Sequence, residues 1–147
     1  MTSICLNANN NTYYELYLMV PHNFTEEDEK KIMTVKINNP EVCNITIINM
    51  GYAYDDALFS ESIPAPSYYR LSLPSLLPQY ERIIYLDGDI IALVDLTEMY
   101  NFELNDKFVL GHIALKINDF YNFNITDTKL YLCGGVILMN LSKMREY

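Results

Sequence analysis

Two aspartates separated by one glycine, Asp87-Gly88-Asp89, are the residues of this sequence best suited to chemistry. They directly follow the apolar run 82–86, which has the composition of a buried strand. Residues two apart in an extended chain face the same way, so the two carboxylates are expected to lie close together and to repel. Oxygen ligands of this kind suit a hard divalent ion such as Mn²⁺ or Mg²⁺. The pattern therefore predicts a metal site in which Gly88 permits a tight turn.

The same three residues can also form nothing more than a turn, because Asp-Gly is among the commonest turn dipeptides. An EF-hand loop is excluded, since it would need Asp or Asn at Ile91 and Gly at Ala92. The glycine patterns of P-loop and dinucleotide-binding proteins are absent from the sequence. On these residues alone, a metal site and a plain turn both remain open.

The composition limits what kind of protein carries these aspartates. The chain has 147 residues, 50% hydrophobic and 20% charged, which is typical of one globular domain. Its net charge of −9, with only 10 basic residues, argues against a nucleic-acid partner. A phosphorylated ligand would need a metal ion to offset the protein's own carboxylates. No apolar run approaches the ~18 residues of a membrane-spanning helix.

The cysteines bear on the cellular compartment. Cys5, Cys43 and Cys133 are widely separated and lack the spacing of a zinc site or a redox pair. They fit reduced thiols, so a cytoplasmic location is expected. Asn-x-Ser/Thr sequons keep the lumen of the Golgi or endoplasmic reticulum open, if a parent chain carries an anchor.

The elements that must position the aspartates alternate between strands and helices. Apolar runs predict strands at residues 13–20, 44–50, 82–86, 107–115 and 131–141. Helices are expected from Thr25, at residues 67–77 around Pro74, at residues 95–100 and from Ser142, with a loop at residues 118–128. This alternation predicts an α/β domain with a mostly parallel sheet. A strand stands first and the last helix is a stub, so both ends are expected to cut through a fold.

Two blocks of the sequence resemble glycosyltransferase family 8, which includes glycogenin-like, galactinol-synthase-like and bacterial lipopolysaccharide glycosyltransferases. The first block comprises residues 68–71, 76–80, 84–90 and 95–96, and the second comprises residues 131–141 and 143–145. The order and separation of the blocks are more specific than either Asp-x-Asp or Gly-Gly alone. The resemblance covers nearly the whole chain and implies a GT-A type α/β fold, incomplete, in one partial domain over residues 1–147.

The resemblance also implies an activity. It is a metal-dependent transfer of a hexosyl group from a UDP-sugar to a hydroxyl acceptor, with retained anomeric configuration. Asp87 and Asp89 match the motif that binds Mn²⁺ (or Mg²⁺) and, through it, the donor's diphosphate. Arg70 matches an arginine that lines the donor pocket. The acceptor, whether a glycan, a lipid-linked saccharide or a protein, is not indicated, and no catalytic residue is assigned.

The second block supplies the remaining donor-binding candidates. Gly134 and Gly135 match a small-residue turn whose backbone approaches the donor sugar, and Cys133 stands where the family often has Asn. Without the resemblance, the glycine pair reads as a β-bulge or the start of a strand.

The departures from the family define the alternatives. The family's first strand is expected before residue 1, and a metal-binding histidine and an acceptor-side motif are expected after residue 147. His22 and His112 stand in the wrong places to be ligands. A truncated, non-catalytic remnant with weak or no nucleotide-sugar binding is therefore one alternative. A haloacid-dehalogenase-type phosphatase, with Asp87 as nucleophile, is another, although Ile91 stands where that motif has Thr.

Overall fold

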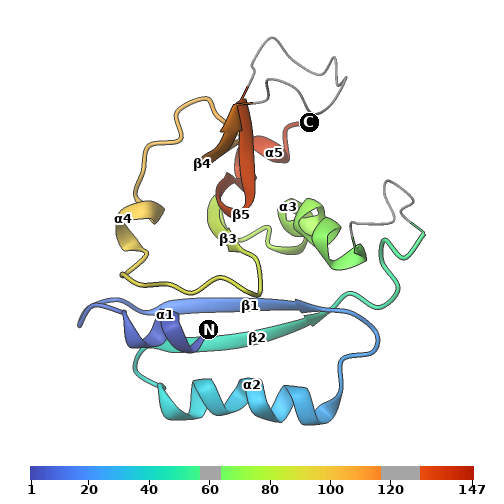
Figure 1. Ribbon diagram of the computed structural model, residues 1–147, viewed down its shortest axis with the longest axis vertical. Coiled ribbons are helices and arrows are strands. Elements are labelled where there is room, and N and C mark those ends of the chain that lie inside the picture. The colour runs from blue at the N-terminus through green and yellow to red at the C-terminus, as the bar shows by residue number, and fades with distance from the viewer. Residues whose placement is uncertain (57–63, 117–129) are drawn as a thin grey trace. The chain divides into compact units, whose positions relative to one another are not determined.

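A computed structural model describes residues 1–56, 64–116 and 130–147 (Figure 1). The chain divides into two compact units. The first comprises Met1–Leu76 and Ile91–Glu98, and the second comprises Leu77–Ile90 and Met99–Tyr147. Each unit has its own sheet and its own buried residues. The expected single domain over residues 1–147 stays a prediction.

The first unit is built on a parallel pair of strands, β1 (Tyr14–Val20) and β2 (Cys43–Asn49), connected by helix α2 (Glu26–Asn38). Helix α2 begins at a capping box. The Asp28 N–H donates to Thr25 Oγ1 at 3.2 Å, and the Thr25 N–H donates to Asp28 Oδ2 at 3.3 Å. Both predicted strands and the predicted start of the helix are confirmed.

The first element of this unit is a helix that the sequence did not predict, α1 (Thr2–Leu6). We expected a strand to come first, and that was wrong. A helix of 5 residues is too short to show a hydrophobic period and is not stable by itself. Tertiary burial supports it: Ile4 and Cys5 are buried, and Cys5 packs with Cys43 and Ile45 in one cluster.

The rest of the first unit is mostly helical or irregular. A 3₁₀ helix, η1 (Ala65–Ser72), leads into the short helix α3 (Leu73–Leu76) where one helix was expected. Pro74 lies in the first turn of α3, where a missing N–H costs nothing. The short helix expected at residues 95–100 is present as α4 (Thr97–Tyr100), and the boundary between the two units falls within it, after Glu98.

The second unit contains a three-stranded sheet in the order β3 (Arg82–Leu86), β5 (Leu130–Asn140), β4 (Val109–Lys116). Both pairs are antiparallel. The predicted mostly parallel sheet is therefore correct for β1 and β2 but wrong for this unit. A continuous apolar run indicates that a strand is covered on both faces, but it does not fix the direction of the neighbouring strand.

The core of the second unit is formed by the end of β5 and the following residues. Leu138 and Leu141 are both 0% exposed. Helix α5 (Leu141–Met144) begins where Asn140 Oδ1 accepts the Lys143 N–H at 3.0 Å, which confirms the expected terminal helix. The loop expected at residues 118–128 lies outside the described residues. Within the ranges that the structure describes, no helix combines the length and the hydropathy needed to cross a membrane.

Candidate functional site

The chain turns directly after β3, in the second unit. The Ile90 N–H donates to the Asp87 carbonyl oxygen at 3.1 Å, so residues 87–90 form a β-turn with Gly88 and Asp89 at its centre. The predicted extended arrangement of Asp87 and Asp89 is therefore wrong, and the turn interpretation is correct for the backbone. A turn can still hold a metal ion, because it leaves both carboxylates at the end of the strand.

Gly88 is not required by the geometry of this turn. Its φ is not positive, and nothing lies within 4 Å of a Cβ added at this position. The expected tight turn is present at Gly88, but its backbone conformation does not need a glycine. Because Gly88 has no side chain, it leaves open space beside the two aspartates.

Asp87 is half-buried and lies against Tyr85 and Gly135. Its N–H donates to the Gly135 carbonyl oxygen at 2.9 Å, which extends the β3–β5 ladder by one residue. The Tyr85 hydroxyl donates to Asp87 Oδ1 at 2.7 Å. A Cβ on Gly135 would lie 2.9 Å from Asp87 Oδ2. Two predicted site residues from separate sequence blocks, Asp87 and Gly135, are thus in direct contact.

The predicted glycine pair lies in an irregular part of β5. On β4, Gly111 is opposite Ile137 and Ile113 is opposite Leu132, so residues 133–136 have no partner in the register of these two strands. The β-bulge interpretation is therefore correct for the backbone of Gly134 and Gly135. On its other side β5 stays paired with β3, and this brings the bulge next to Asp87.

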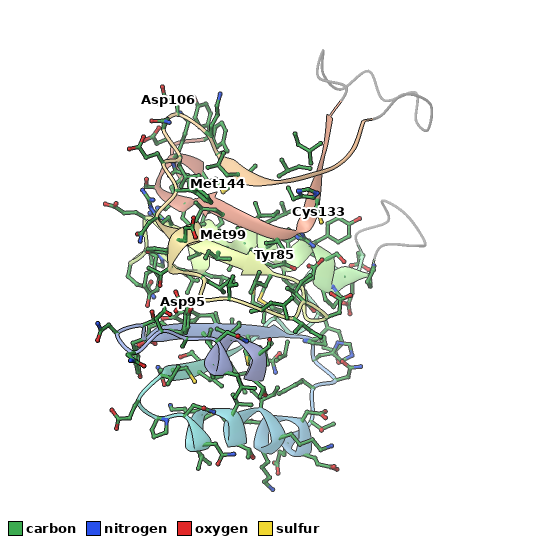
Figure 2. The ribbon with its side chains drawn as sticks, turned by 60° about the vertical axis from the view of Figure 1, so that its left-hand side comes forward. Tyr85, Asp95, Met99, Asp106, Cys133 and Met144 are labelled. Atoms are coloured by element: carbon green, nitrogen blue, oxygen red, sulfur yellow. The ribbon has the colours of Figure 1, made fainter. Side chains whose placement is uncertain are left out.

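The remaining predicted residues lie as follows. Cys133 is a half-buried thiol on β5, and Figure 2 shows it in the same sheet as Tyr85 of β3. Arg70 belongs to the first unit, where its Nε donates to the Ser67 carbonyl oxygen at 2.8 Å within η1. His22, also in the first unit, stacks on Tyr52 with ring centroids 4.1 Å apart.

The two aspartates at the turn fit a divalent cation that keeps several water ligands when it binds to a protein. Asp89 is exposed, and the orientation of the Asp87 carboxylate is fixed. Across residues 1–56, 64–116 and 130–147, no group of three or more His, Cys, Asp or Glu side chains is gathered for a metal. Mg²⁺ is typically held by one or two carboxylates together with water and substrate phosphates. Asp87 and Asp89 can supply that number.

Tyr85 is the residue of this site that sequence reasoning missed. It stands two residues before Asp87 on a strand, and this spacing puts both side chains on one face of the sheet. Side chains alternate along a strand with a period of two residues, and this alternation was the signal that could have identified Tyr85.

Asp95, in the first matching block, has a structural role in the first unit. Its Oδ2 accepts the Asn9 N–H at 2.8 Å, and its Oδ1 accepts the Thr97 N–H at 2.8 Å. Burial acts to raise the pKa of Asp95, but these hydrogen bonds and those of the Thr97 and Thr12 side chains outweigh it and hold the pKa well below its usual value.

Comparison with known proteins gives consistent matches. The whole chain, residues 1–147, matches the model of glycosyl transferase family 8. A putative glycosyltransferase of Haemophilus influenzae is 28% identical over an alignment 160 positions long, which covers 91% of this chain and 47% of that protein. General stress protein A of Bacillus subtilis is 28% identical over 101 residues, which cover 63% of this chain and 34% of that protein. The chain thus spans less than half the length of each of these two relatives.

Solved structures show the same fold. The galactosyltransferase LgtC, crystallised with donor and acceptor sugar analogs, superposes with a TM-score of 0.67 at 20% identity, covering 91% of this chain and 60% of LgtC. The bifunctional glycosyltransferase WbbM superposes with a TM-score of 0.76 at 17% identity, covering 99% of this chain and 29% of WbbM. The expected GT-A type α/β fold, incomplete, is confirmed. Because the family model matches residues 1–147, the chain belongs to glycosyl transferase family 8.

Proposed function

We propose that this chain provides the donor-sugar site of a metal-dependent hexosyltransferase that uses a UDP-sugar. The carboxylate of Asp87, fixed at the end of β3 by Tyr85 and Gly135, is the observation that carries the proposal. The acceptor is a hydroxyl group of a glycan, a lipid-linked saccharide or a protein. A cytoplasmic location stays a prediction.

Each site residue has a role in this proposal. Asp87 and Asp89 would hold Mn²⁺ or Mg²⁺, and through that ion the diphosphate of the donor. When bound, the ion acts as a Lewis acid that stabilises negative charge on the departing UDP. Arg70 belongs to the first unit and stays a predicted donor-pocket residue, whose planar guanidinium has the geometry that phosphate recognition requires.

The segment from Cys133 to Gly135 faces the donor sugar in the same proposal. A bulge without side chains at Gly134 and Gly135 lets backbone groups approach a ligand closely. Gly88 leaves comparable open space beside the aspartates. Membership of the family removes the basis for the phosphatase alternative, in which Asp87 would be a nucleophile.

The test is a thermal unfolding experiment on the full chain with Mn²⁺ alone, UDP alone and both together. A ligand that binds only the native state at 100 times its Kd adds about 2.7 kcal/mol of stability. For a chain of this size that corresponds to a rise in Tm of roughly 5–10 °C. We expect the rise only with both components present, and we expect Asp87→Ala with Asp89→Ala to abolish it.

Asp106→Asn is the matched control, because this carboxylate is fully exposed and lies 3.8 Å from Lys143 Nζ, away from the β3 turn. It should leave the rise intact. A cooperative transition that Mn²⁺ and UDP together do not shift would reject the proposal for this chain and support the non-catalytic remnant. If Mn²⁺ and UDP together do raise Tm, a panel of UDP-sugars measured in the same way would identify the preferred sugar by the size of the shift.

A further inference from the structure

The Tyr85 hydroxyl is bonded to the carboxylate of Asp87, two residues further along the chain. Tyr85 and Asp87 occupy the same face of the chain at the end of β3, because side chains two apart in a strand point the same way. The O–H···O distance of 2.7 Å lies in the range of hydrogen bonds to an ionised carboxylate. This contact fixes Oδ1 from one side.

Gly135 leaves room for the other oxygen, Oδ2, because it has no side chain. A Cβ at Gly135 would lie 2.9 Å from Oδ2 of Asp87, 3.5 Å from its Cγ and 3.7 Å from its Cβ. All three nearest atoms belong to Asp87, so the aspartate side chain lies over the glycine. Because the Asp87 N–H is bonded to the Gly135 carbonyl oxygen at 2.9 Å, the two backbones cannot separate easily to admit a larger residue.

We infer that Tyr85 and Gly135 are positioning residues, which hold the Asp87 carboxylate in one orientation before a cation arrives. The inference rests on the proposed function, in which Asp87 binds the metal. A carboxylate that is already ordered loses less side-chain freedom on binding. Residues that orient a metal ligand by hydrogen bonding typically change metal affinity 10- to 100-fold when they are replaced.

This assigns Gly135 a role that differs from contact with the donor sugar. If the glycine were needed only for the sugar, its replacement would affect sugar selectivity and leave Mn²⁺ binding unchanged. If it provides the space for Asp87, an added methyl group displaces the carboxylate, and Mn²⁺ binding falls. The atom that would clash is the end of a flexible side chain, so Gly135→Ala should displace Asp87 and leave the strand in place.

The experiment measures Mn²⁺ affinity in the presence of UDP, from the electron paramagnetic resonance signal of free Mn²⁺, on the full chain and two variants. Tyr85→Phe removes one oxygen and keeps the ring, and Gly135→Ala adds one carbon. We expect each to weaken Mn²⁺ binding by about 10-fold or more, while Tm without ligand falls by no more than about 3 °C. Tyr147→Phe is the matched control, because the Tyr147 side chain is 93% exposed. It should change the affinity less than twofold.

The outcomes separate this inference from the proposed function. Wild-type binding that both variants retain would overturn the positioning role and leave the metal site standing. Weaker binding together with a fall in ligand-free Tm beyond about 3 °C would also overturn it, because the residues would then be merely structural. If the wild-type chain binds no Mn²⁺ with UDP, the proposed function fails and the inference fails with it. Weaker binding in both variants with Tm preserved establishes the inference.

Discussion

Asp95 offers the sharpest test of how this sequence stabilises its first unit. Its two carboxylate oxygens accept two backbone N–H groups, those of Asn9 and Thr97, each at 2.8 Å. One contact joins residues 86 positions apart in the sequence, and the other organises the start of α4. Asp95→Ala removes both acceptors and leaves both N–H groups without this partner.

The magnitude follows from these contacts. A hydrogen bond to a charged group contributes about 1.5–3 kcal/mol, and partial exposure to water places these two toward or below the lower limit. We therefore expect Asp95→Ala to lower the free energy of unfolding by about 2 kcal/mol, which corresponds to a fall in Tm of roughly 4–8 °C. Asp95→Asn keeps one acceptor oxygen and should lose about half as much.

The pH dependence supplies an independent check. The pKa of Asp95 is below its usual value in the folded chain, so the folded state binds fewer protons than the unfolded state in acid. The stabilisation is present above the unfolded pKa of about 3.9 and is lost as the pH falls below it. Part of the acid destabilisation of the wild-type chain should therefore be missing in Asp95→Asn.

Urea unfolding between pH 7 and pH 3 measures both effects. The chain has 13 tyrosines and no tryptophan, so tyrosine fluorescence and far-ultraviolet circular dichroism are the suitable signals. Asp106→Asn is the control, since an exposed ion pair contributes little. An Asp95→Ala chain as stable as the wild type at pH 7, or an Asp95→Asn chain with the same acid dependence, would refute the reasoning.

Three further predictions concern other parts of the chain. Gly88→Ala should leave Tm unchanged within about 2 °C, because the added Cβ meets nothing and φ is not positive, and a larger loss in a thermal melt would contradict the structure. Burial and the neighbouring Cys5 thiol raise the pKa of Cys43 to about 11, so the stability that this protonated thiol contributes is present below its unfolded pKa of about 8.5 and is lost as the pH rises toward 11. Alkylation of the native chain at pH 8 followed by mass spectrometry should modify Cys133 before Cys43, which is 1% exposed; modification in the reverse order would show that Cys43 is accessible. Thr25→Ala removes the capping box of α2 and should cost about 1 kcal/mol in urea unfolding, whereas an unchanged midpoint would mean that the cap is not formed in solution.

Local features of the sequence predicted most of the elements. The capping box at Thr25 marked the start of α2, and apolar runs located β1, β2 and β3 to within one residue at each end. These signals depend on neighbouring residues, so they can be read without knowledge of the fold. Helix α1 shows where this approach stops, because burial of Cys5 against Cys43, 38 residues away, supports it.

The sequence by itself determined the candidate carboxylates, Asp87 and Asp89, and their place at the end of a strand, whose residues are half-buried and not buried as expected. Residue type and spacing were sufficient for that, because both are local properties. Only the tertiary structure decided that β3 pairs antiparallel with β5, and this pairing puts Gly135 under the Asp87 side chain. Strand direction depends on which distant segment pairs with the strand, and a continuous apolar run such as residues 83–86 has no alternation that would specify its partner or its register. The support of Asp87 by Tyr85 and Gly135 therefore became visible only when the two strands were paired.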